Sequence, residues 1–257
     1  MYKRQTLDLA ADGHWTYTLD NDSTTVQSMG VNDSAQNIFN VTSADGTPAQ
    51  ITITIKGTND VAVIGGTAEG AVQEDTTLTA SGTLTANDPD AGQNTFTPAT
   101  LVGTHGTLDL AADGQWTYTL DNDSTTVQSM GANDSAQNIF NVTSADGTPA
   151  QITIMINGTN DAAVIGGTAA GAVQEDTTLT ASGTLTVNDP DAGQNTFTPA
   201  TLVGTHGTLD LAADGQWTYT LDNDSTTVQS MGASSTAQNI FNVTSVDGTV
   251  VLSLSRV

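Results

Sequence analysis

One block of sequence occurs three times in this chain, at a spacing that limits what the chain can fold into. The block LDLAADG-WTYTLDNDSTTVQSMG begins at Leu7, Leu108 and Leu209, so the period from one copy to the next is 101 residues. Solenoid repeats are about 20–50 residues long, because each is one supersecondary unit that cannot bury its own apolar face. A unit twice that length can form its own core. The sequence therefore predicts a row of separate domains.

The repeat predicts three domain segments of unequal completeness. The first copy begins at residues that match Thr107 onward, so we expect about half a domain to lie upstream of Met1. The predicted segments are residues 1–58, the truncated C-terminal part of a repeat; residues 59–159, a complete repeat; and residues 160–257, a nearly complete repeat with a divergent last strand.

The divergence of the last copy lies at its end. When Thr249 is aligned with Thr148, Ser253 and Ser255 fall where the preceding copy has isoleucine. A deletion of one residue would restore the alternation of apolar residues, because side chains alternate between the two faces of a strand.

Strand patterns dominate each unit, and helix signals are nearly absent. QITIMI (residues 151–156) and QWTYTL (residues 115–120) place apolar residues at every second position. LDLAADGQWTYTL (residues 108–120) is predicted to be a β-hairpin with a turn at Asp113-Gly114. Seven or so short strands in each unit indicate an all-β fold, a tandem array of antiparallel β-sandwich domains of the Ig-like kind, elongated overall. Trp15, Trp116 and Trp217 are predicted to lie in the cores.

The chain is strongly acidic, with 28 Asp and Glu against 4 Lys and Arg and a formal net charge of −24. Residues 57–255 contain 22 carboxylates and no Lys or Arg. Salt bridges cannot neutralise this charge, and the chain should repel nucleic acid and anionic membranes. Dissolved cations are the natural counter-charge, and a solvated acidic surface is the alternative.

Cysteine is absent, which excludes disulfides and thiolate metal sites. No run approaches the roughly 20 apolar residues that span a bilayer, and residues 1–13 lack the apolar segment of a signal peptide. Stability is therefore expected to come from packing or from ions bound by oxygen ligands.

The segment NDPDAGQNTF occurs at residues 87–96 and again at residues 188–197. Asp88, Asp90 and Asn94 offer oxygen ligands at alternating positions, and Gly92 allows a tight bend. Calcium takes roughly 6–8 oxygen ligands, so one such loop can supply only part of a shell. An ordinary turn is the alternative, because Pro, Asn and Asp are frequent in turns. The spacing is not that of an EF-hand.

Further motifs follow this loop in a fixed order: LDND (residues 120–123), ADG (residues 145–147) and ITIMINGTND (residues 152–161). Together with D-x-D-x-G-x-N they resemble the ordered calcium motifs of cadherin repeats. Within that superfamily GTND, QED and above all DGxWTYTLDN resemble the VCBS repeats of large bacterial secreted or cell-surface adhesins of the RTX type. The resemblance covers essentially the whole chain.

The resemblance implies cadherin-like domains whose junctions bind Ca²⁺ through one domain, the linker and the next domain. The first junction would use Asp20, Asp22, Asn59, Asp60, Asp88, Asp90, Asn94 and Asp146. The second would use Glu74, Asp121, Asp123, Asn160, Asp161, Asp189, Asp191, Asn195 and Asp247. Cadherin linkers typically read D-x-N-D-N, whereas GTND is followed here by Val61 or Ala162. Fewer ions or weaker binding is therefore expected, near the ~10⁻⁴–10⁻³ M of extracellular modules.

The predicted function is that of a Ca²⁺-stabilised spacer or stalk of a bacterial surface adhesin, outside the cell, in adhesion and biofilm formation. Its partners would be the neighbouring repeats, Ca²⁺ and, through other domains, host or matrix glycans and proteins, without nucleic acid or membrane insertion. One alternative is a carbohydrate- or protein-binding β-sandwich module, and another is an accessory repeat of a secreted hydrolase. An enzyme is not predicted, because His105 and His206 lie in GTHGT segments typical of turns.

Overall fold

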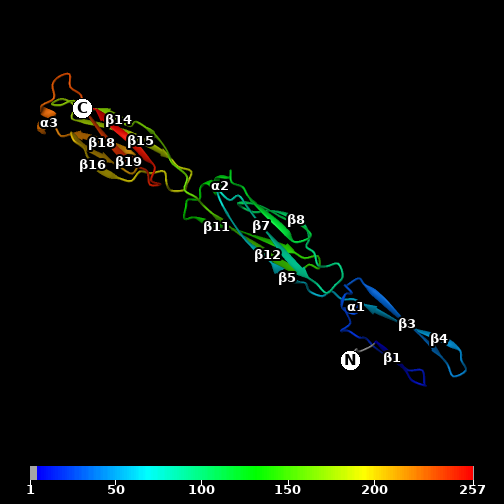
Figure 1. Ribbon diagram of the computed structural model, residues 1–257. Coiled ribbons are helices and arrows are strands. Elements are labelled where there is room, and N and C mark those ends of the chain that lie inside the picture. Colours follow the sequence, from blue (N-terminus) through cyan, green and yellow to red (C-terminus); the bar gives the residue numbers. More distant parts are fainter. Residues whose placement is uncertain (1–4, 257) are drawn as a thin grey trace. The chain divides into compact units, whose positions relative to one another are not determined.

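The computed structural model describes residues 5–256 of the chain, and side chains as far as residue 250. These residues form β-strands connected by turns, with three helices of a single turn (Figure 1). This confirms the predicted all-β class. Contacts divide the chain into two compact units, Met1–Val72 with Thr79–Leu120 and Gln137–Met155, and Gln73–Leu78 with Asp121–Ala136 and Ile156–Val257. The limits of these units do not coincide with the limits of the 101-residue repeats.

The first copy contributes two hairpins. Its elements are β1 (Thr6–Leu9), β2 (Trp15–Thr18), α1 (Thr24–Gln27), β3 (Ser34–Thr42) and β4 (Pro48–Lys56). β1 pairs with β2 in one two-stranded sheet, and β3 pairs with β4 in another.

The second copy forms two sheets. Its elements are β5 (Val63–Gly66), β6 (Glu69–Gln73), β7 (Thr79–Asn87), β8 (Ala99–Val102), β9 (Gly106–Leu110), β10 (Gln115–Leu120), α2 (Thr125–Gln128), β11 (Ser135–Thr143) and β12 (Pro149–Asn157). The strand order is β5-β7-β10-β9-β8 in one sheet and β11-β12-β6 in the other.

The third copy repeats this topology. Its elements are β13 (Val164–Gly167), β14 (Ala170–Ala172), β15 (Thr180–Asn188), β16 (Ala200–Val203), β17 (Gly207–Leu211), β18 (Gln216–Leu221), α3 (Thr226–Gln229), β19 (Gln238–Thr244) and β20 (Val250–Arg256). The sheets have the orders β13-β15-β18-β17-β16 and β14-β20-β19.

The period-two pattern explains how these sheets bury a core. Trp116, Tyr118 and Leu120 alternate with exposed neighbours along β10, and each is at most 4% exposed. The hairpin that the sequence predicts is present as β9–β10, and it pairs Leu110 with Trp116. In the third copy the equivalent side chains pack into one buried cluster, which includes Leu185, Phe197, Leu209, Leu211, Trp217, Tyr219, Val228 and Phe241.

Two features differ from the prediction. The TTVQ segments form one-turn helices, because the preceding serine caps each of them; Ser124 Oγ, for example, accepts a hydrogen bond from the Val127 N–H at 3.3 Å. Trp15 is 48% exposed, so the prediction that it is a core residue is wrong. Trp116 lies on β10, which has β7 on one side and β9 on the other. Trp15 lies on β2, which among the described residues pairs only with β1.

The last strand keeps the backbone register of the first copy. Phe241 pairs with Ser253 in β19–β20, as Phe39 pairs with Ile51 in β3–β4. The side chains of Ser253 and Ser255 lie outside the described residues, so their effect on the core stays a prediction.

Candidate metal centres at the repeat junctions

We define the first junction as the linker residues 57–62 with the residues that contact them, and the second junction as residues 158–163 with their contacts. Every candidate ligand of the first junction belongs to the first compact unit, and every candidate ligand of the second belongs to the second unit. The geometry of each junction can therefore be described within one unit.

The D-x-D-x-G-x-N loop after β7 turns its carboxylates inward. The Asp90 N–H donates to Asp88 Oδ1 at 2.8 Å, and the Asp88 N–H donates to Asn94 Oδ1 at 2.7 Å. Gly92 closes the bend with φ +81°, which glycine adopts without strain. Asp88 and Asp90 are buried, with 5% and 0% of their surface exposed. The loop after β15 repeats these bonds at Asp189, Asp191, Gly193 and Asn195.

The linker backbone is bonded to these carboxylates. The Asp60 N–H donates to Asp90 Oδ2 at 3.0 Å, and the Ala62 N–H donates to Asp146 Oδ2 at 3.1 Å. In the second junction the Asp161 and Ala163 N–H groups make the same bonds to Asp191 and Asp247. The structure thus brings together, at each junction, the linker, the D-x-D-x-G-x-N loop and the turn that carries Asp146 or Asp247.

Asp146 and Asp247 are held as charged acceptors. Burial acts to raise the pKa of Asp146, but hydrogen bonds from Ser144, Thr148 and the Ala62 N–H outweigh it, so the pKa lies well below its ordinary value. The same set of bonds lowers the pKa of Asp247. These two groups stay ionised at any physiological pH.

Each linker also bonds to the turn after the short helix of the preceding copy. The Gly57 N–H donates to the Asp33 carbonyl and the Gly158 N–H donates to the Asp134 carbonyl, both at 3.0 Å. The loop after β15 contacts the same region, because the Ala192 N–H donates to the Ser129 carbonyl at 3.1 Å. A Cβ on Gly158 would lie 2.3 Å from the Met130 carbonyl oxygen. Only glycine fits this approach, which accounts for the first letter of GTND.

Replacing Gly158 by alanine should displace the linker and destabilise the second junction by roughly 1–3 kcal/mol, because backbone atoms must move. Scanning calorimetry and protease cleavage within residues 157–163 measure the effect. Gly232→Ala is the control, since the nearest atom to its added Cβ is 3.8 Å away. Equal melting and equal cleavage in the two variants would contradict the proposed packing.

Glu74 is a fully buried carboxylate of the second junction, as Asp191 is. It is 0% exposed, and its Oε1 accepts the Thr159 N–H at 2.7 Å. Burial raises its pKa, the bond from Thr159 opposes the rise, and the charges of Asp161 and Asp75 add to it; the net pKa is raised.

Asp75 is a junction residue that the sequence analysis missed. Its Oδ1 accepts hydrogen bonds from Asn122 Nδ2 at 2.8 Å and Gln128 Nε2 at 3.2 Å, and its φ is +59°. Its carboxylate also interacts directly with that of Asp161. Burial and the charges of Asp75 and Asp191 raise the pKa of Asp161. Two adjacent carboxylates with no basic residue nearby provide negative charge that a cation would neutralise.

Six carboxylate oxygens at the junctions are buried without a hydrogen-bond partner. They are Asp88 Oδ2 and Asp90 Oδ1 in the first junction, and Glu74 Oε2, Asp161 Oδ2, Asp189 Oδ2 and Asp191 Oδ1 in the second. The same two atoms of the loop recur in both copies. Burying a carboxylate oxygen without a partner is costly unless a cation or proton compensates it, so this donor set fits an oxygen-ligated divalent ion.

The remaining predicted ligands are less enclosed. Asp22, Asn59, Asn94, Asp121, Asp123, Asn160 and Asn195 are exposed, and Asp20 is half-buried. Asn59 and Asn160 use their side-chain amides to bond the next carbonyl. In the part of the chain that the structure describes, no three His, Asp or Glu side chains are gathered closely enough to hold a metal ion. The assignment of all seventeen residues as ligands therefore stays a prediction.

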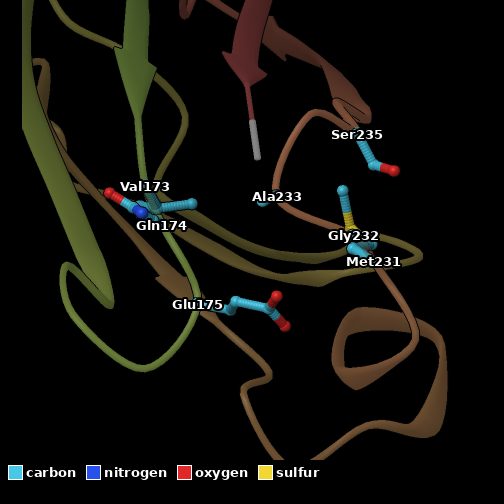
Figure 2. A pocket seen from close by; sticks show the side chains of 7 residues that line it. All are labelled: Val173, Gln174, Glu175, Met231, Gly232, Ala233 and Ser235. Atoms are coloured by element: carbon cyan, nitrogen blue, oxygen red, sulfur yellow. The ribbon is translucent and has the colours of Figure 1, made fainter.

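The position in the third copy that corresponds to Glu74 has no linker over it among the described residues. Glu175, which corresponds to Glu74, is half-buried and lines a small pocket of about 90 Å³ with Val173, Gln174, Met231, Gly232, Ala233 and Ser235 (Figure 2). No linker lies over this pocket among the described residues. The complete burial of Glu74 is thus a product of the junction, not of the domain alone.

Both loop histidines have structural contacts. His105 Nδ1 lies 3.1 Å from Asn138 Oδ1, and His206 Nδ1 lies 3.2 Å from Asn239 Oδ1. Each asparagine also donates to a buried tyrosine hydroxyl. These contacts suit the assignment of the histidines to turns. Among the residues described, no helix is long and apolar enough to cross a membrane.

The fold and the junctions define a class of protein: tandem β-sandwich repeats with carboxylate-rich ends. A family model described as "Bacterial cadherin-like domain" matches residues 59–158 and residues 160–256, and the chain belongs to this family. Members with cadherin-like domains have structural and adhesive roles. No match was found among curated proteins.

Several solved cadherin structures are similar to this chain. The PcdhgB3 EC1-4 fragment is 15% identical, with a TM-score of 0.47 over 98% of this chain and 62% of its own. Drosophila N-cadherin EC1-4 is 12% identical, with a TM-score of 0.47 over 89% and 58%. Protocadherin Gamma C5 EC1-3 is 14% identical, with a TM-score of 0.44 over 97% and 85%. The chain thus spans less than two thirds of the length of the first two.

Proposed function

We propose that this chain is part of the stalk of a bacterial surface adhesin, in which Ca²⁺ bound at the junctions stabilises consecutive repeats. The observation that carries the proposal is the set of buried, unpartnered carboxylate oxygens that recurs at equivalent atoms of both junctions. No Lys or Arg lies between residues 57 and 255 to neutralise them.

The residues that would hold the ion come from three elements of each junction. In the second junction these are Glu74 and Asp75 between β6 and β7, Asp161 of the linker, and Asp189 and Asp191 of the loop after β15. A bound Ca²⁺ would supply positive charge and would be coordinated by the carboxylate oxygens that lack hydrogen-bond partners. The chain's own contribution is to hold these oxygens inward through the Asp191 and Asp161 N–H bonds.

Ca²⁺ binding would stabilise the folded junction through thermodynamic linkage between binding and folding. An ion that binds the folded junction but not the unfolded chain stabilises it by RT ln(1 + [Ca²⁺]/Kd), about 2.7 kcal/mol at one hundred times Kd. Sites of roughly millimolar affinity would be filled outside a cell and empty in the cytosol. Such a stalk would suit an extracellular, cell-surface position and a role in adhesion and biofilms, with the adhesive contact made by other domains. Within the family, a VCBS repeat of an RTX-type adhesin is the subgroup we propose.

Calorimetric titration of the full chain with Ca²⁺ tests the proposal. We expect saturable binding that falls at least tenfold in affinity when Asp90 and Asp191 are both replaced by Asn. Asp113→Asn with Asp214→Asn is the matched control, because these exposed turn carboxylates should leave binding unchanged. Absence of binding, or equal loss in both double variants, would refute a junction site.

A further inference from the structure

A glutamine follows the glycine of each D-x-D-x-G-x-N loop and bonds back to a carboxylate of the loop. Gln194 Nε2 donates a hydrogen bond to Asp191 Oδ2 at 3.0 Å, and Gln93 Nε2 donates to Asp90 Oδ2 at 3.2 Å. A carboxylate only accepts hydrogen bonds, which orients each amide with its nitrogen toward the aspartate. The glutamine is not among the predicted ligands, yet its bond recurs in both copies of the loop.

The aspartate that the glutamine contacts has one oxygen with two donors and one oxygen with none. Asp191 Oδ2 also accepts the Asp161 N–H at 3.1 Å, whereas Asp191 Oδ1 is buried without a hydrogen-bond partner. In the first junction Asp90 Oδ2 also accepts the Asp60 N–H, and Asp90 Oδ1 lacks a partner. Two donors on Oδ2 hold the carboxylate at one rotation about its Cβ–Cγ bond, so Oδ1 is the oxygen that it presents to a cation.

Each glutamine also lies against the preceding copy. A Cβ added to Gly131 would lie 3.0 Å from Gln194 Nε2, and a Cβ added to Gly30 would lie 2.9 Å from Gln93 Nε2. Both glycines are buried, in the turns after α2 and α1. Gln194 and Gly131 belong to one compact unit, and Gln93 and Gly30 belong to the other. Each amide therefore lies between a glycine of one copy and a carboxylate of the next.

Hydrogen bonds fix the turn that carries Gly131. The Gly131 N–H donates to Asp134 Oδ2 at 3.0 Å, and the Asp134 N–H donates to the Gly131 carbonyl at 2.8 Å. The loop is bonded to the same turn, because the Ala192 N–H donates to the Ser129 carbonyl at 3.1 Å. The turn after α1 repeats these three bonds. The glycine, the amide and the carboxylate are thus held in contact from both sides.

We propose that Gln93 and Gln194 are positioning residues that couple cation binding at each junction to the contact with the preceding copy. The inference rests on the proposed Ca²⁺ function. While the turn lies against the loop, the amide is confined beside the glycine and fixes the carboxylate with Oδ1 unpartnered. When the turn moves away, the amide loses this support and the carboxylate can rotate. By reciprocity, an ion bound at Oδ1 strengthens the contact between copies by the same factor.

Calorimetric titration of the full chain with Ca²⁺ tests the inference in a variant with Gln93→Met and Gln194→Met. Methionine has a similar length and no N–H donor, so it removes the bond to Oδ2. We expect the Ca²⁺ affinity to fall about tenfold, as it does when other groups that orient a metal ligand are removed. Melting in chelator should change little, because the backbone bond from the linker to Oδ2 remains.

Gln115→Met with Gln216→Met is the matched control. These two glutamines donate the same kind of bond, from Nε2 to an aspartate oxygen at 2.9 Å, in exposed turns that contain no candidate ligand. Their replacement should leave the Ca²⁺ affinity unchanged.

A second variant, Gly30→Ala with Gly131→Ala, reaches the same contact from the other copy. Neither glycine has a left-handed φ, so alanine fits the backbone, and its methyl group would displace the end of the flexible glutamine side chain. We expect a loss of Ca²⁺ affinity similar to that of the methionine variant. Gly232→Ala should leave the affinity unchanged, because the nearest atom to its added Cβ is 3.8 Å away.

The outcomes separate this inference from the proposed function. Saturable binding by the wild-type chain with unchanged affinity in either the methionine or the alanine variant would overturn the inference and leave the junction site standing. An equal loss in the glutamine control, or a fall of the melting temperature in chelator as large as in Ca²⁺, would show a general structural effect and overturn it as well. Absence of Ca²⁺ binding by the wild-type chain would refute the proposed function and this inference with it.

Discussion

Glu74→Gln should raise the stability of the second junction in the presence of a chelator and lower it in the presence of Ca²⁺. Without a cation, the Glu74 carboxylate is buried with Oε2 unpartnered and its pKa raised. Glutamine keeps an acceptor for the Thr159 N–H and can donate to the neighbouring carboxylates. Removing the unpaired charge should gain about 1–3 kcal/mol, or roughly 4–8 °C for each kcal/mol in a domain of this size.

With saturating Ca²⁺ the sign should reverse, because the variant lacks one anionic ligand. Melting by scanning calorimetry, in chelator and in millimolar Ca²⁺, measures both effects. Glu175→Gln is the matched control: it changes the same residue of the repeat where no linker covers it, and its melting should shift by less than about 0.5 kcal/mol in either condition.

The pH dependence in chelator should have a definite sign. The pKa values of Glu74, Asp161 and Asp189 are raised by burial, so the folded state binds protons more readily than the unfolded state. Stability should therefore rise as the pH falls from 7 through these raised values. Glu74→Gln should flatten this rise. A destabilising effect of Glu74→Gln in chelator would show that Glu74 is not an uncompensated charge.

The sequence predicts the fold well because its strong signals are local. Alternation of apolar residues along β10 and β12 identifies both the strands and their buried faces, and the Asp113-Gly114 turn identifies the hairpin. The exposure of Trp15 could not be read from the same pattern. Burial depends on which strands lie beside it, and residues 7–58 carry the same letters as a copy that is covered.

The candidate site is predicted less completely, because its parts meet through tertiary contacts. The D-x-D-x-G-x-N loop is a local motif, and its bonds are local as well. Asp75 was missed because its role depends on Asn122 and Asp161, which are distant in sequence. Its positive φ is the structural sign of a constrained position. The QED motif drew attention to Glu74. Asp75 is the last residue of the same motif, and this acidic residue beside Glu74 was the signal that could have been used.

Trp116→Ala should destabilise its repeat far more than Trp15→Ala destabilises the chain. Trp116 is 1% exposed and donates to the Thr67 carbonyl. Its removal loses buried apolar surface, leaves a cavity against Gly82 and removes the donor to a carbonyl, which together cost about 3–5 kcal/mol. Trp15 is 48% exposed, so its replacement should cost less than about 1 kcal/mol.

Trp217 provides the internal check on this comparison. It is 2% exposed and donates to the Thr168 carbonyl at 2.7 Å, so Trp217→Ala should be as damaging to the third copy as Trp116→Ala is to the second. Calorimetry and chemical denaturation in the presence of Ca²⁺ measure the loss of stability in all three tryptophan variants. Three equal losses would mean that the first copy has a closed core in solution. Two large losses and one small one would mean that a tryptophan in this repeat stabilises the fold only when the first half of the repeat lies against it.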